Sequence, residues 1–169
     1  MCSTLATMRI IGVSGLPRSG KDTVAEMLMR RGWYGVSFGD IVRDYARKRH
    51  ADKPDPISVK NMTNTSNWLR ETRGSDVILK EALARYQAEL ANGASYEGLV
   101  LYSVRAPVEA DFILAKGGDV VWVETSDEIR FERSKAARRE GEAVIDFAEF
   151  RRQENLQWQP QPGIPGECK

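Results

Sequence analysis

The sequence predicts an α/β fold in which helices cover both faces of a parallel sheet. Short runs of β-branched residues alternate with longer stretches of helical periodicity along the 169 residues, as in βαβ units. A glycine-rich segment joins the first β-rich run to the first helical stretch, where open α/β sheets place a ligand site. The length suits a single domain over residues 1–169, with flexible tails at residues 1–7 and 159–169.

The first half of the chain predicts strands and helices in turn. Residues Arg9–Ser14 are apolar and β-branched, which is typical of a buried strand. The stretch Lys21–Arg31 repeats apolar residues on one helical face and meets Gly32, a helix stop signal. The same criteria predict a strand at Tyr34–Phe38, helices at Asp40–His50, Ser58–Thr72 and Asp76–Ala91, and a proline-containing loop at Ala51–Ile57.

The second half continues the alternation. Leu99–Val104 is apolar on both faces, as a central parallel strand should be. Pro107–Lys116 predicts a short helix, because proline is favoured in a first helical turn. The remaining expected elements are a strand at Asp119–Glu124, a helix from a Ser126 cap to about Ala137, a charged loop at Arg138–Val144 and a last helix at Phe147–Gln157.

Composition and charge disfavour several classes of protein. The formal net charge of +1 argues against a strongly basic nucleic-acid binder. No apolar run approaches the ~20 residues of a membrane span. Cys2 and Cys168 form no CxxC pair, and His50 has no partner at metal-ligand spacing. We therefore expect no nucleic-acid partner and no membrane association, and the cysteine pattern is compatible with a cytoplasmic protein.

The glycine-rich segment at residues 15–23 (GLPRSGKDT) carries the strongest functional signal. It matches the phosphate-binding pattern G-x-x-x-x-G-K-[ST] up to Lys21, with Asp22 at the usual hydroxyl position and Thr23 next. Glycines let backbone N–H groups surround a phosphate at a helix N-terminus, and Lys21 would reach the β- and γ-phosphates during transfer. The predicted ATP-binding residues are Gly15, Arg18, Ser19, Gly20, Lys21, Asp22 and Thr23, with Mg²⁺ at Thr23.

Two segments resemble nucleotide kinases. GLPRSGKDT resembles the phosphate loop of nucleoside monophosphate kinases, and residues 37–43 (SFGDIVR) resemble the adenylate-kinase segment that opens the acceptor-binding helix. In that family the arginine grips the acceptor phosphate, which implies this role for Arg43; the alternative is a solvated helix residue. The chain is also similar to dephospho-coenzyme A kinases and, over about residues 8–158, to an archaeal group of nucleotide-kinase-like proteins. The resemblance implies a three-layer P-loop NTPase fold with a helical acceptor-binding insertion and a short lid.

The resemblance also implies roles for further residues. Arg105 follows the central strand, at the sheet edge where ligands bind, and would contact a transferring or acceptor phosphate. Arg133, Arg138 and Arg139 flank the charged loop, which resembles a lid that closes over phosphates; the balance of charges there equally fits a solvated helical hairpin. Asp40 is a candidate to orient an acceptor hydroxyl, or else it caps its helix.

Two departures from the family keep other functions open. Tyr102 stands near the end of the third strand, where the family usually has an acidic residue that helps hold magnesium. Asp40 and Glu124 are candidates to replace that acid. The family's further strand and adenine-binding loop have no matching pattern in residues 159–169. We expect an ATP-dependent phosphotransferase acting on a nucleotide-like small molecule, with a P-loop NTPase or a non-catalytic nucleotide-binding regulator as alternatives.

Overall fold

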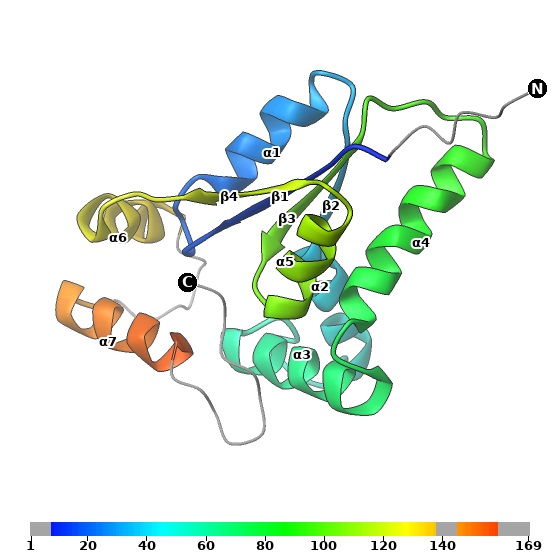
Figure 1. The fold of residues 1–169 in the computed structure, drawn as a ribbon. Coiled ribbons are helices and arrows are strands. Elements are labelled where there is room, and N and C mark those ends of the chain that lie inside the picture. Colours follow the sequence, from blue (N-terminus) through cyan, green and yellow to red (C-terminus); the bar gives the residue numbers. More distant parts are fainter. Residues whose placement is uncertain (1–7, 138–144, 159–169) are drawn as a thin grey trace, which may run out of the picture.

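The computed structural model describes residues 8–137 and 145–158 (Figure 1). The predicted flexible tails, and the candidate lid residues Arg138 and Arg139, lie outside the described residues. Strands β1 to β4 form one parallel sheet in the order β2-β3-β1-β4. Their bounds are β1 Ile10–Gly15, β2 Tyr34–Ser37, β3 Leu99–Val104 and β4 Asp119–Val123. The parallel sheet predicted from the sequence is confirmed.

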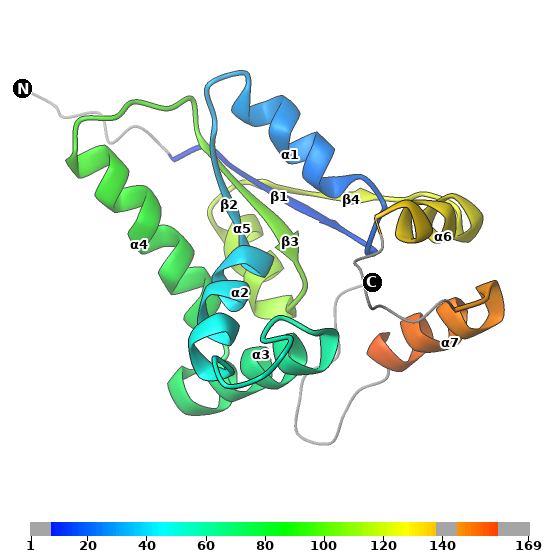
Figure 2. The same cartoon turned by 180° about the vertical axis from the view of Figure 1, so that it is seen from behind.

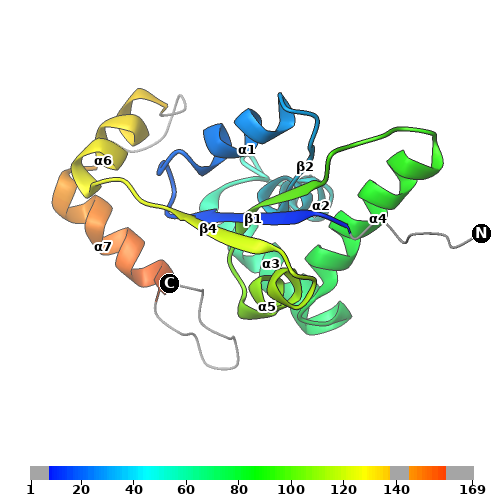
Figure 3. The same cartoon turned by 45° about the horizontal axis from the view of Figure 1, so that its top comes forward.

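Helices cover both faces of the sheet, so the molecule has three layers. Helix α1 (Lys21–Met29) lies on one face and α5 (Pro107–Ala115) on the other (Figure 3). Alternate residues of the central strands supply the two cores, because successive strand side chains point to opposite faces. Leu99 and Leu101 of β3 pack on the α5 side, whereas Val100 packs with Ala25 on the α1 side. The predicted three-layer architecture is confirmed.

Three helices are inserted between β2 and β3. They are α2 (Phe38–Arg49), α3 (Val59–Arg73) and α4 (Val77–Ala91), and they lie together on the α5 side of the sheet (Figure 2). Ile41 of α2 and Ile78 of α4 are fully or almost fully buried in the core that also contains β3. The helical insertion is confirmed, and its role in acceptor binding stays a prediction.

The junction of β2 and α2 differs from the prediction. The strand ends at Ser37, and α2 begins at Phe38 rather than at Asp40. The hydroxyl of Ser37 accepts the backbone N–H of Asp40 at 3.1 Å, which makes Ser37 the N-cap. The alternative in which Asp40 caps the helix is therefore wrong, because Asp40 lies inside the first turn.

The last two helices follow β4. Helix α6 (Asp127–Ala136) begins after the predicted Ser126 cap, whose hydroxyl accepts the Ile129 N–H at 3.4 Å. Helix α7 (Phe147–Trp158) lies close to α6, beyond the carboxyl end of β4 (Figures 1 and 2). Within the part of the chain that the structure describes, no helix has the length and apolar character needed to cross a membrane.

Candidate nucleotide-binding site

The predicted phosphate loop runs from the end of β1 into the first turn of α1. Gly15 and Gly20 have φ values of 147° and 101°, in the region that favours glycine. Arg18 also has a positive φ of 65°, which costs about 1 to 2 kcal/mol for a residue with a Cβ. A Cβ on Gly15 would lie 2.5 Å from the carbonyl oxygen of Val123 on β4. The loop therefore requires glycine at position 15 for its backbone conformation and for its contact with the next strand.

Three consecutive carbonyl groups of this loop accept hydrogen bonds from the segment after β4. The bonds are Thr125 hydroxyl to Ser19 at 2.7 Å, Arg130 guanidinium to Pro17 at 3.4 Å, and Arg133 guanidinium to Arg18 at 2.9 Å. A trans peptide points a carbonyl and the following N–H in opposite directions. The N–H groups of Arg18 and Gly20 therefore point away from α6. The N–H of Ser19 between them donates to the carbonyl of Leu16 at 3.1 Å, so the N–H groups of Arg18 and Gly20 are the ones in this stretch that an anion can contact.

Two buried polar groups in the loop favour an anionic ligand. Lys21 begins α1 and is only 7% exposed. Burial lowers the pKa of Lys21, and the charges of Arg105 and Arg18 lower it further, while Asp22 raises it. The hydroxyl of Ser19 is buried, and no hydrogen-bond partner for it is present among the described residues. A desolvated cation and a buried hydroxyl without a partner are each stabilised by a polar ligand that contacts them.

The carboxyl end of β3 brings a second cation to the loop. The pairing of β1 with β3 shifts register after Val13, and Ser103 has a φ of 62°. Irregularities of this kind redirect the side chains that follow them. Arg105 lies just beyond the irregularity, and its charge reaches Lys21, whose pKa it lowers. The structure thus places the charge of Arg105 within electrostatic reach of Lys21 at the carboxyl edge of the sheet, and the phosphate-binding role of Arg105 stays a prediction.

Glu109 of α5 fixes the main chain at Arg105 by hydrogen bonds. The residue is 1% exposed, and its Oε2 accepts the N–H groups of Arg105 and Ala106, each at 2.9 Å. Its Oε1 accepts a hydrogen bond from the Arg70 guanidinium of α3 at 3.2 Å. This one buried carboxylate therefore connects the loop after β3 to the helical insertion.

Arg43 lies beside the same edge of the sheet. Its guanidinium forms an ion pair with Asp40, three residues earlier on α2. Burial and the charges of Asp22 and Glu26 raise the pKa of Tyr102 at the end of β3, while a hydrogen bond to Ser37 and the charge of Arg43 lower it. The side chain of Asp40 is 53% exposed. The structure thus places Arg43 within electrostatic reach of Tyr102 and holds Asp40 in a pair with Arg43.

Comparisons with known proteins identify the family. A family model described as an AAA domain matches residues 11–157. The chain belongs to the AAA domain family. It is 28% identical over 137 residues to a UPF0200 protein of Methanococcus maripaludis, covering 80% of this chain and 71% of the relative. It is 30% identical over 145 residues to a UPF0200 protein of Methanothermobacter thermautotrophicus, covering 85% of this chain and 68% of the relative.

A solved structure with a similar fold comes from "Structure of the Pnkp1/Rnl/Hen1 RNA repair complex". The TM-score is 0.51 at 15% sequence identity, over 90% of this AAA domain and 45% of that chain. This AAA domain therefore spans less than half of the matched chain, and the likeness concerns the fold alone. The phosphate-loop motif, the parallel sheet and the family match together indicate a P-loop NTPase fold. The archaeal relatives agree with the archaeal resemblance noted in the sequence.

Two buried charged residues of the AAA domain were missed as site residues. Arg130 is 1% exposed and donates to Asp127 at 2.6 Å and to Glu154 of α7 at 2.7 Å, besides its bond to the loop. Its sequence neighbours indicate an ordinary charged helix, and Glu154 lies 24 residues further along. The sequence does give one local indication for Glu109: an acidic side chain in the first turn of a helix is stabilised by the helix dipole. Its partner Arg70 is 39 residues away, which no local pattern reveals.

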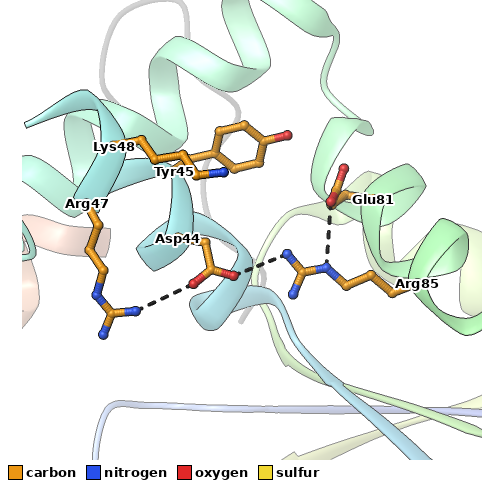
Figure 4. Close-up of a pocket in the computed structure, with 6 residues that line it drawn as sticks. All are labelled: Asp44, Tyr45, Arg47, Lys48, Glu81 and Arg85. Carbon is orange, nitrogen blue, oxygen red and sulfur yellow. Dashed lines mark hydrogen bonds and ion pairs between the residues drawn. The ribbon is translucent and has the colours of Figure 1, made fainter.

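A separate cavity of about 280 Å³ lies between α2 and α4 (Figure 4). Its lining residues are Asp44, Tyr45, Arg47, Lys48, Glu81 and Arg85. Asp44 forms ion pairs with Arg47 at 3.5 Å and with Arg85 at 3.2 Å, and Arg85 also reaches Glu81 at 3.6 Å. These charges largely neutralise one another, and the lining includes no residue of the phosphate loop. The cavity is therefore distinct from the candidate nucleotide site of this AAA domain.

The donors around the phosphate loop suit a nucleotide with Mg²⁺. Residues 8–137 and 145–158 contain no group of three or more His, Cys, Asp or Glu side chains arranged to hold a metal. Mg²⁺ at phosphate sites typically keeps waters and uses the phosphates plus one or two carboxylates. Thr23, the predicted magnesium residue, is exposed in the first turn of α1, and Asp22 precedes it there. These two oxygen-bearing side chains are of the kind that could contact such a cation.

We expect Glu109→Gln to destabilise this AAA domain by about 2 to 3 kcal/mol, because the amide loses the negative charge and sets an NH2 donor against either Arg70 or the loop N–H groups. Urea unfolding measures the change. Glu71→Gln is the control, since Glu71 is exposed on α3 and should change stability by less than about 0.5 kcal/mol. Equal effects of the two substitutions would show that the Glu109 carboxylate does not hold the loop.

We expect binding of ATP at alkaline pH to take up protons, because a bound polyphosphate raises the lowered pKa of Lys21. For the same reason, affinity should fall as pH rises above the pKa of Lys21 in the free protein, towards the usual 10.5 of lysine. Calorimetry in buffers of different ionisation enthalpy measures the uptake. Lys21→Arg is the control, because arginine does not deprotonate. Uptake that persists in this variant would exclude Lys21 as its source.

Proposed function

We propose that this protein is an ATP-dependent phosphotransferase that acts on a nucleotide-like small molecule. The acceptor would be a nucleoside monophosphate or a dephospho-coenzyme A type compound. One observation carries the proposal: the buried ammonium of Lys21 and the charge of Arg105 lie within electrostatic reach of each other, on two different elements. Lys21 suits the transferring triphosphate, and the fork of N–H donors of Arg105 suits a phosphate of the acceptor or the phosphate in transfer.

The proposed roles follow from the positions of the residues. The loop N–H groups and Lys21 hold the triphosphate, with Lys21 at the β- and γ-oxygens where charge shifts during transfer. Arg43 and Arg105 position the acceptor phosphate, and Asp40 orients the acceptor hydroxyl. Bound Mg²⁺ would neutralise charge on the β- and γ-oxygens. Alignment of the two substrates and electrostatic stabilisation would supply most of the rate acceleration.

Asp40 and Arg43 are linked in this proposal by their ion pair. The pair holds the guanidinium near Tyr102, whose pKa its charge lowers. An acceptor phosphate would replace the carboxylate as the partner of Arg43 and leave Asp40 to accept a hydrogen bond from the acceptor hydroxyl. The exchange keeps Arg43 paired with an anion throughout, so neither state leaves it uncompensated.

A non-catalytic nucleotide-binding regulator is the second candidate. The observation that favours it is Tyr102 at the end of β3, where the resembling kinases usually carry an acid that helps hold magnesium. A phenol whose pKa is raised stays neutral and supplies no negative charge for a cation. The two candidates differ in turnover, because the regulator binds ATP and releases no ADP.

A coupled ADP-release screen should show release that depends on one class of acceptor among ribonucleoside monophosphates, deoxyribonucleoside monophosphates and dephospho-coenzyme A. Lys21→Ala is the control and should abolish most of the release, because it removes the cation at the transferring phosphate. Equal release of ADP with and without every acceptor would indicate an NTPase and contradict the kinase. Binding of ATP with no release would favour the regulator.

We expect Arg43→Ala to raise the acceptor KM about tenfold or more, which corresponds to about 1.4 kcal/mol, and to leave the ATP KM within about twofold. Arg47→Ala is a matched control, since Arg47 lies one turn along α2 in an exposed pair with Asp44. Steady-state kinetics with each substrate varied in turn make the comparison. If the two variants had identical kinetics, Arg43 would not be part of the acceptor site.

A further inference from the structure

Helix α7 is connected to the phosphate loop through one buried arginine. The side chain of Arg130 on α6 is 1% exposed, and its guanidinium donates to the carbonyl of Pro17 in the loop at 3.4 Å. It also donates from Nε to the carbonyl of Thr125, after β4, at 3.2 Å. Both of its terminal nitrogens donate to the carboxylate of Glu154 on α7, and the bond from Nη2 is 2.7 Å long. A single cation thus contacts the loop, the segment after β4 and α7.

The carboxylate of Glu154 determines the direction of this guanidinium. Glu154 is 8% exposed, and its two oxygens accept from both terminal nitrogens of Arg130. A carboxylate in this geometry fixes the plane of an arginine. Asp127 also pairs with Arg130, but its side chain is 36% exposed and is shared with Arg151 at 3.1 Å. Without Glu154, the buried cation would lose its most buried partner and would turn towards Asp127 and water.

Aromatic side chains hold α7 beside α6 (Figures 1 and 2). Phe131 of α6 lies 5.4 Å from Phe147 and 5.5 Å from Phe150, measured between ring centroids. The ring of Phe150 also lies 5.6 Å from the guanidinium carbon of Arg130. These contacts join the two helices to each other. The hydrogen-bonded connection from α7 to the carbonyl of Pro17 is the pair of Glu154 with Arg130.

The bond from Arg130 acts on the part of the loop that an anion would contact. A planar trans peptide couples the carbonyl of Pro17 to the N–H of Arg18, and Arg18 has a positive φ of 65°. Such a backbone conformation persists only where the surroundings hold it. The buried hydroxyl of Ser19, which has no partner among the described residues, independently indicates that a ligand belongs in the loop. Loss of the bond from Arg130 would therefore loosen the loop at the N–H groups that an anion needs.

We propose that Glu154 is a positioning residue for nucleotide binding, which through Arg130 holds the phosphate loop in the shape that accepts a polyphosphate. Docking of α7 and binding of the phosphates are then coupled, and the coupling is reciprocal, so that each strengthens the other by the same factor. The inference rests on nucleotide binding under the proposed function. It assigns no contact between Glu154 and the nucleotide.

Calorimetric titration with inorganic tripolyphosphate and with ATP, both in the presence of Mg²⁺, tests the role of Glu154. Glu154→Gln should bind each ligand about five- to tenfold more weakly than the wild type, because the loop loses a hydrogen bond that holds its shape. The two ligands should be weakened alike, since tripolyphosphate has no nucleoside and contacts the phosphate site alone. Weakening of ATP alone, or of neither ligand, would overturn the proposal.

The folded fraction and a matched variant separate positioning from stability. Urea unfolding gives the folded fraction of each variant, and the titrations use conditions in which it exceeds about 95%, so that unfolding changes a dissociation constant by less than about a tenth. Glu149→Gln removes the same charge from α7, at a residue paired with Arg152 at 2.6 Å near the surface. It should leave both dissociation constants within about twofold of the wild type. Equal losses in Glu149→Gln and Glu154→Gln would reduce the effect to the charge of α7 and contradict the assignment.

A double-mutant cycle tests whether Glu154 acts through Arg130. Lysine keeps the positive charge but lacks the fork of donors that reaches Glu154 and Pro17 together. Arg130→Lys alone should weaken tripolyphosphate binding about five- to tenfold. Glu154→Gln added to it should weaken binding by less than a further factor of about two, because the connection is already broken. Additive losses would show that Glu154 does not act through Arg130, and the proposal would fail.

Hydrogen exchange on the wild type provides a test that needs no variant. Saturating tripolyphosphate should slow exchange of the α7 amides, because the bound anion stabilises the docked helix. Amides of α4, on the α5 side of the sheet (Figure 2), report any general stabilisation of the fold. Slowing in α7 by no larger a factor than in α4 would exclude the coupling.

Failure of this inference is distinguishable from failure of the proposed function. If the wild type binds neither ATP nor tripolyphosphate, the anion site itself is wrong, and the proposed function and this inference fall together. If the wild type binds both and Glu154→Gln binds them equally well, only the role of Glu154 is overturned. If the coupling is found but no acceptor stimulates ADP release, the role of Glu154 is upheld and the kinase is contradicted.

Discussion

The candidate site depends on how the phosphate loop is held from its carbonyl side. Donors from Thr125, Arg130 and Arg133 fix three consecutive carbonyls of the loop. Because peptide units are planar, fixing the carbonyls of Pro17 and Ser19 also fixes the direction of the N–H groups of Arg18 and Gly20 that follow them. The anion-binding face is therefore set by groups that need not touch the anion. Arg130 extends this support to α7 through Glu154, so the packing of α6 and α7 is part of the loop's geometry.

The other part of the site is defined by charged side chains, those of Lys21 and Arg105, rather than by backbone groups. Burial lowers the pKa of Lys21, and the charge of Asp22 offsets that effect only in part. Arg105 adds a second positive charge nearby, and the buried carboxylate of Glu109 fixes its backbone. Glu109 also accepts a hydrogen bond from Arg70 of α3. A movement of the insertion would therefore shift Glu109 and, with it, the backbone of Arg105. The fold thus provides a physical connection between the region proposed for the acceptor and the edge of the sheet.

The sequence predicted the elements well because their signals are local. The apolar run of β3 and the glycines of the phosphate loop are sufficient by themselves to indicate a buried strand and a nest for phosphate. The β2–α2 junction was misplaced because Ser37 and Asp40 are both good caps, and only the hydrogen bond distinguishes them. Arg130 and Glu109 were missed for a different reason. Their roles come from partners 24 and 39 residues away, and a charged residue that is buried by such partners has the same local pattern as one on the surface.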